Sequence, residues 1–178
     1  MKKAVLIATL VSLATAMADD SVMAGTLGIG SFEGDPSIFA TFTRLDKDDS
    51  NEMVIEASKN NIDINLYKPM KIKTFKDVSV GFESGYVKFK GYDPAGSMGL
   101  ATTYFIDAPY QKIGIYLKTG FNLAFSGASK KEIDSLYRAT LATSYNRFIA
   151  GVSYKRINLF NPNGDDRVNF FVGYSFTW

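Results

Sequence analysis

The chain has 178 residues, no cysteine and no histidine, and its formal charge at pH 7 is +2. The length predicts one domain, the absence of cysteine excludes a disulfide framework, and the near-neutral charge excludes the basic footprint of a nucleic-acid-binding protein. The mean hydropathy of −0.03 excludes helical membrane spans, but a membrane β-barrel has half-apolar strands and is compatible with such a value.

Residues 1–18 have the pattern of a secretory signal peptide. Lys2 and Lys3 precede an uncharged apolar stretch, and a small-x-small sequence ends at Ala18. We expect cleavage after Ala18, which leaves 19–178 as a single domain with a formal charge of 0. The alternative is a membrane anchor, but the apolar stretch is short for a spanning helix of about 20 residues.

The N-terminal third contains four candidate strands, which read "GTLGIGSF", "SIFATFTRL", "EMVIEAS" and "IDINLYK". Residues 77–90 then begin with strict alternation and change phase across Ser84 and Gly85. This phase change predicts a β-bulge or a tight turn there.

The rest of the chain alternates with period 2, so that one face of each segment is apolar or aromatic and the other is small or polar. Phe171 is the single exception in the last segment. The segments meet or approach the 9 to 11 residues that a tilted strand needs to cross a bilayer. They are 98–107, 112–125, 137–145, 148–155 and 167–178.

Short and long connections alternate between these segments, as expected when inner turns are tight and outer loops are longer. The inner turns are "DAPYQ" and "YNR", and the outer loops are "GYDPAGS", "SGASKKEID" and "NPNGDD". The pattern predicts an all-β fold, a closed antiparallel transmembrane β-barrel with an even number of strands. Eight strands are favoured on size; ten result if all four N-terminal candidates are separate.

These features resemble the small outer-membrane β-barrels of Gram-negative bacteria, the class of the OmpX and OmpA transmembrane domains. The resemblance rests on the signal peptide, the alternating hairpins of 77–178 and the ending Tyr174-x-Phe176-x-Trp178. The segment "YKRINLFNPNGDDRVNFFVGYSF" is also similar to YfaZ-like barrels.

The resemblance implies that Tyr174, Phe176 and Trp178 form an assembly signal read by the barrel-insertion machinery. It also implies location in the cell outer membrane, outer-membrane lipid and lipopolysaccharide as surroundings, and a monomer. A soluble lipocalin-like barrel with its apolar face inside is the competing fold, because alternation alone does not distinguish inside from outside.

Several charged residues lie on the polar faces and are predicted to point into the lumen. An eight-stranded barrel is just wide enough for side chains to fill it, so these charges should form a hydrogen-bonded network and not a pore. A ten-stranded barrel would permit a narrow channel for small solutes or ions. On the faces that can be assigned to the lumen, basic residues outnumber acidic ones, which would favour anions in such a channel. Glu52, Glu56 and Asp63 have no assigned face and could offset this positive excess. The predicted network residues are Glu83, Asp107, Lys118, Arg138, Lys155 and Arg167.

The absence of histidine argues against an enzyme, because histidine is the side chain whose unperturbed pKa lies closest to neutrality. The weaker alternative is a histidine-free enzyme that acts on lipid or lipopolysaccharide through Glu83 and Asp107. The run "DKDDSNE" lacks the turning glycine of a calcium loop, where it has Asn51, so we expect no metal and no cofactor. The sequence therefore favours a structural or surface-interaction protein without a reaction of its own.

Overall fold

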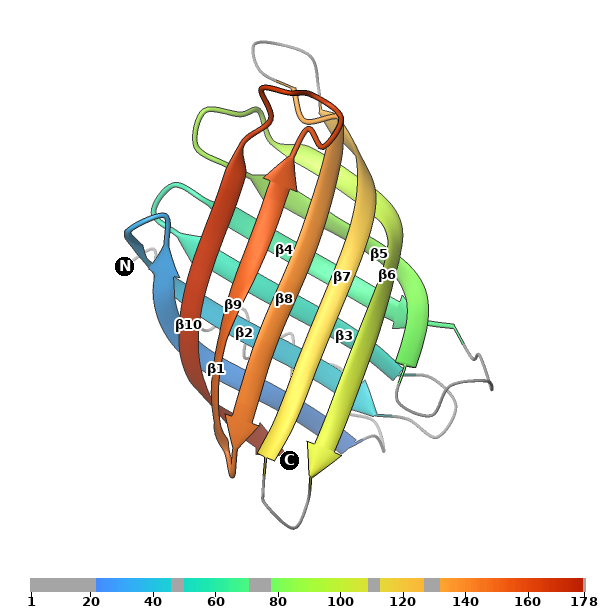
Figure 1. Ribbon diagram of the computed structural model, residues 1–178, viewed down its shortest axis with the longest axis vertical. Coiled ribbons are helices and arrows are strands. Elements are labelled where there is room, and N and C mark those ends of the chain that lie inside the picture. Colours follow the sequence, from blue (N-terminus) through green and yellow to red (C-terminus); the bar gives the residue numbers. More distant parts are fainter. Residues whose placement is uncertain (1–21, 46–49, 71–77, 109–112, 127–131, 178) are drawn as a thin grey trace.

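The computed structural model describes residues 22–45, 50–70, 78–108, 113–126 and 132–177. Each strand pairs antiparallel with its neighbours in the chain, and β1 pairs with β10, which closes the barrel (Figure 1). No helix in the described part of the chain is long and apolar enough to cross a membrane. The strands are β1 (Val22–Phe32), β2 (Asp35–Leu45), β3 (Ser50–Ser58), β4 (Ile62–Pro69), β5 (Val78–Lys88), β6 (Ala95–Ala108), β7 (Ile113–Ser126), β8 (Ser135–Tyr145), β9 (Phe148–Ile157) and β10 (Asp166–Thr177).

The barrel has ten strands, so the closed antiparallel fold is confirmed and the preference for eight strands is wrong. All four N-terminal candidates are separate strands, β1 to β4. β1 and β2 are joined by only Glu33 and Gly34, whose φ angles of 57° and 82° make a tight reversal. Such a short turn leaves little trace in the hydrophobic pattern.

β5 runs without interruption, so the bulge or turn expected at Ser84 and Gly85 is wrong. The register of β5 with β4 and with β6 is continuous through both residues. Val87 and Phe89 instead point into the lumen, where they join a cluster that we call the apolar plug. The plug consists of Phe32, Val87, Phe89, Tyr92, Ala95, Ala124, Ile133, Leu136 and Ile157.

The connections differ between the two ends of the barrel. We call the end where β10 finishes the terminal end; it is the lower end in Figure 1. In the C-terminal half the terminal end has short connections, 109–112 and 146–147, as expected. In the N-terminal half the order is reversed, because the terminal ends of β4 and β5 are separated by 70–77 in the sequence, whereas only Glu33 and Gly34 join β1 to β2 at the other end.

Phe171, the exception to the alternation of β10, points into the lumen and stacks on Phe39. The ring centroids are 3.8 Å apart and the planes differ by 6°. The two rings flank β1 opposite Gly28 and Gly30, so the stack covers the seam where the barrel closes. Gly151 faces the same ring, and a Cβ there would lie 2.6 Å from Phe171 Cζ, so this position must be glycine for the stack to form.

Candidate functional site

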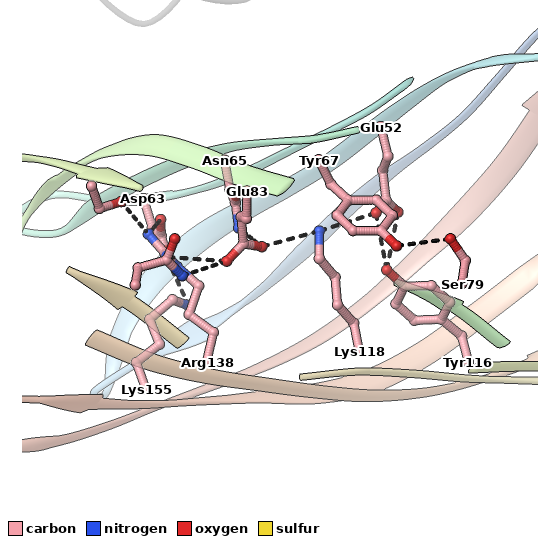
Figure 2. A network of polar contacts seen from close by, with 12 residues as sticks. Glu52, Asp63, Asn65, Tyr67, Ser79, Glu83, Tyr116, Lys118, Arg138 and Lys155 are labelled. Atoms are coloured by element: carbon pink, nitrogen blue, oxygen red, sulfur yellow. Dashed lines mark hydrogen bonds and ion pairs between the residues drawn. The ribbon is translucent and has the colours of Figure 1, made fainter. Parts of the chain in front are cut away.

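The lumen brings acidic side chains from one half of the barrel against cations from the other. Carboxylates extend from β3, β4 and β5, and cations from β7, β8 and β9 (Figure 2). We call this set the lumen network. It consists of Glu52, Glu56, Asp63 and Glu83 on the acidic wall and Lys118, Arg138 and Lys155 on the basic wall.

At the plug side of the network, Lys155 lies between two carboxylates. Its Nζ is 2.8 Å from Glu56 Oε2 and 3.5 Å from Asp63 Oδ2. Glu56 also accepts hydrogen bonds of 2.7 Å from Ser153 Oγ and from Asn169 Nδ2. Lys155 is 1% exposed, so the whole cation is withdrawn from solvent and depends on these partners.

Glu83 is the centre of the network and is 1% exposed. It accepts hydrogen bonds from the amides of Asn65 and Asn122, the latter at 2.6 Å. It also lies 3.4 Å from Arg138 Nη1 and 3.3 Å from Lys118 Nζ. Four donors therefore converge on one carboxylate that reaches across the lumen from β5.

Arg138 connects this centre to Asp63. Its Nε and Nη2 donate to the two Asp63 oxygens at 3.1 and 3.0 Å, the two-pronged geometry in which arginine pairs most strongly with a carboxylate. Nη2 also donates to Ser97 Oγ at 3.3 Å. The guanidinium therefore ties β8 to β4, β5 and β6.

Towards the terminal end, the network finishes in a layer of tyrosines. Lys118 Nζ is 3.1 Å from Glu52 Oε2 and 4.7 Å from the centroid of the Tyr67 ring. Tyr116 donates to both Glu52 oxygens at 3.1 Å, and the Tyr67 and Ser79 hydroxyls are 2.8 Å apart. This layer is visible on the right of Figure 2.

The network leaves almost no free space. The cavity between these side chains has a volume of about 30 Å³, which is room for a single water molecule. Four carboxylates and three cations leave a formal charge of −1, and each carboxylate is engaged by at least one cation. Each of these groups is therefore held by oppositely charged or hydrogen-bonded partners inside the barrel.

The structure brings together four of the six residues proposed from the sequence, namely Glu83, Lys118, Arg138 and Lys155. Arg167 belongs to a different cluster at the plug end, where it bonds to the Glu33 carboxylate and lies 3.3 Å from Asp165. The Asp107 side chain lies outside the described residues.

Sequence reasoning missed three of the four residues of the acidic wall. Glu52, Glu56 and Asp63 had no assigned face, because the N-terminal strands had not been delimited. The alternation of "EMVIEAS", with Glu52, Val54 and Glu56 on one side, was the available signal. It becomes interpretable once β3 is recognised as a separate strand.

Two residues of the proposed assembly signal lie on the outer face of β10. Tyr174 is exposed, and its ring meets that of Phe148 edge to face at 5.5 Å. Phe176 lies on the same face, two residues further along β10, whereas Trp178 lies outside the described residues. In the described part of the chain no three potential ligands gather as a metal site, and residues 46–49 of the "DKDDSNE" run fall outside it.

No protein-family model and no curated protein matches the chain. Solved structures that align with this chain include the N-terminal β-barrel domain of Pseudomonas aeruginosa OprF, at 10% identity over 87% of this chain and 97% of that chain, with a TM-score of 0.40. The NanC porin aligns at 10% identity over 84% and 98%, with a TM-score of 0.46. The outer membrane enzyme PagL aligns at 11% identity over 86% and 98%, with a TM-score of 0.39. All three similarities are distant, with identities of 10 to 11% and TM-scores below 0.5, and they assign the chain no individual role.

Proposed function

We propose that the protein is an integral outer-membrane β-barrel with a closed lumen and a structural or surface-interaction role. The observation that carries this proposal is the inverted polarity of the barrel. Its outer face presents apolar side chains on almost every strand, while its interior holds seven charged groups. A soluble protein of this size rarely exposes such a continuous apolar surface.

The exposed side chains support lipid contact along β1 and along β4 to β10. Ile29 on β1 is 70% exposed, Phe82 on β5 60% and Phe170 on β10 62%. The long strands β6 and β7 add a further apolar stripe. A lipocalin-like barrel requires the reverse arrangement, with apolar side chains around an internal ligand, and the buried ion pairs of the lumen argue against it.

Two layers of side chains inside the barrel favour a closed lumen and argue against a channel. The lumen network leaves about 30 Å³, and the apolar plug lies between it and the loops of the far end. Plug residues such as Phe32, Leu136 and Ile157 are 0% exposed. An ion would have to displace both the plug and the paired charges, which makes conduction by this conformation unfavourable.

Membrane integration is tested by fractionating cells that express the full chain. We expect the protein in the outer-membrane pellet after a carbonate or urea wash, and slower gel migration after boiling than before. The matched variant Phe82→Asp places a charge on the lipid face of β5 and should reduce the recovered barrel, whereas Lys88→Asp at the strand end should not. Recovery of the wild-type protein in the soluble periplasm would overturn the proposal.

We further propose that Tyr174, Phe176 and Trp178 direct assembly by the barrel-insertion machinery. Phe176→Ser should lower the amount of folded barrel in the membrane with the transcript level unchanged. The matched control is Val168→Ser, on the same face of the same strand but near its start. Equal folded amounts of the two variants would contradict the assignment. We propose no reaction, because the chain has no histidine and the carboxylates of the lumen network are held by cations.

A further inference from the structure

Between the lumen network and the terminal end, the lumen widens into a cavity of about 590 Å³. We call it the cup. Its volume is in the range of small-molecule sites, about 300 to 1,000 Å³. The cup is separate from the small space inside the network, and the charged side chains that fill the lumen do not fill it.

The cup is blind at its inner end. Glu52, Tyr67 and Tyr116 close it off as the tyrosine layer of the network, and the Phe39–Phe171 stack forms part of its wall. Above that floor lie the rest of the network and then the plug. A molecule that enters from the terminal end therefore meets a preformed base and has no exit on the other side.

The wall of the cup is rich in hydroxyl groups carried by rigid strands. Thr26 and Ser175 are already bonded to each other across the closing seam at 2.9 Å. The remaining hydroxyls come from β2, β5, β6 and β8. They belong to Thr41, Thr43, Ser79, Thr103, Thr140 and Ser144.

The charge of the cup favours an uncharged ligand. Among the residues that the structure describes, its lining contains one carboxylate, Glu52, and neither lysine nor arginine. That carboxylate is already paired with Lys118 and hydrogen-bonded to Tyr116. An anion would find no cation within this described lining, and a cation would have to compete with the Lys118 ammonium for Glu52.

The cup also offers an aromatic surface. Phe105 points inward from β6 and is 48% exposed, unusually high for a lumen-facing aromatic residue. Its ring extends over the neighbouring strand β7 next to Gly114, where an added Cβ would lie 3.4 Å from the ring. The electron-rich face of such a ring attracts the slightly positive C–H groups of a sugar.

We propose that the cup binds a small neutral saccharide, one or two sugar rings in size. Ring C–H groups would lie on Phe105, and sugar hydroxyls would exchange hydrogen bonds with threonines such as Thr41 and Thr140. The proposal requires only the barrel fold. That the cup opens towards the periplasm rests on the proposed membrane location. The binding test does not depend on that location.

The test is a titration of the refolded full chain by amide NMR in lauryldimethylamine oxide micelles, a detergent without a sugar headgroup. The neutral probes are N-acetylglucosamine and maltose, and the charged controls are gluconate and glucosamine. We expect saturable shifts at Thr41, Phe105 and Thr140 with a neutral probe, and smaller shifts with the charged ones. No saturable shift with either neutral probe, or an equal response to gluconate, overturns the proposal.

Two variants locate the site. Thr41→Val with Thr140→Val removes two hydroxyls at constant shape and should weaken binding about tenfold or more, since each lost hydrogen bond contributes on the order of 1 kcal/mol. The matched control is Thr102→Val with Thr119→Val, a facing pair on the outer surface, which should leave the affinity unchanged. Ala142→Phe should fill the cup and abolish binding, with its folding checked by heat-modifiable migration. Unchanged affinity in the Thr41/Thr140 variant contradicts the site even where Ala142→Phe does not fold.

Discussion

The two halves of the barrel place opposite charges inside the lumen. β3, β4 and β5 carry the acidic wall, whereas β7, β8 and β9 carry the basic wall. Neither wall can be buried alone, because an uncompensated charge in a dry interior costs several kcal/mol. The charges are compensated only when the two halves meet, so the contacts that fill the lumen also hold the closed barrel together.

The largest expected effect comes from removing the centre of the acidic wall. Glu83→Gln leaves Lys118 and Arg138 with fewer partners and should lower the free energy of unfolding by about 3–5 kcal/mol. The measurement is the urea midpoint of the heat-modifiable band after refolding. Glu132→Gln, an exposed carboxylate near β8, is the matched control and should change it little. Equal midpoints for the two variants would falsify the assignment of Glu83 as the centre.

The closing seam provides a second comparison, between neighbouring aromatics that face opposite ways. Phe171→Ala removes the stack on Phe39 and should cost about 3 kcal/mol, because it opens a cavity in a packed interior. Phe170→Ala, on the lipid face one residue earlier, creates no interior cavity and should cost less. The same urea titration in micelles measures both, and a larger cost at Phe170 would show that the lumen is not packed at this level.

The coupling between the walls is measured by a double-mutant cycle. Asp63→Leu and Arg138→Met each leave a buried charged partner unpaired, whereas the double variant removes both charges. We expect the double variant to be less destabilised than the sum of the two single variants by about 1–3 kcal/mol. Simple additivity would mean that the two walls do not interact across the lumen.

The smallest effect is expected at the plug end, where Arg167 meets Glu33. This pair is partly exposed, with the Glu33 side chain at 30%, so Glu33→Gln should cost less than about 1 kcal/mol. High salt should reduce the difference further, because exposed charges are screened. A cost as large as that of Glu83→Gln would contradict the distinction between the rim and the interior.

The sequence predicted the C-terminal half well, for physical reasons. From β6 onwards the strands are 10 to 14 residues long and alternate with few exceptions, so their faces and connections follow directly from the sequence. Lys118, Arg138 and Lys155 were placed on the lumen side in this way. Phe171 broke the pattern because the stack with Phe39 requires an aromatic residue inside.

The N-terminal half was harder to predict. β3 and β4 have 9 and 8 residues, and the turns after β1 and β3 are only two or three residues long. The change of phase in β5 indicates a bulge or a tight turn in the sequence, because an apolar plug inside a polar lumen does not follow from alternation. The pairing of Glu83 with two cations and two amides depends on which strands face each other across the lumen, which a single sequence does not contain.

Conductance across a planar bilayer tests the closed lumen most directly. Refolded wild-type protein should insert without stepwise ion currents, because the apolar plug and the lumen network both block the path. An empty-micelle addition gives the baseline, and heat-modifiable migration of the same sample shows that the barrel is folded. Stepwise currents from the folded wild-type barrel would contradict the closed lumen.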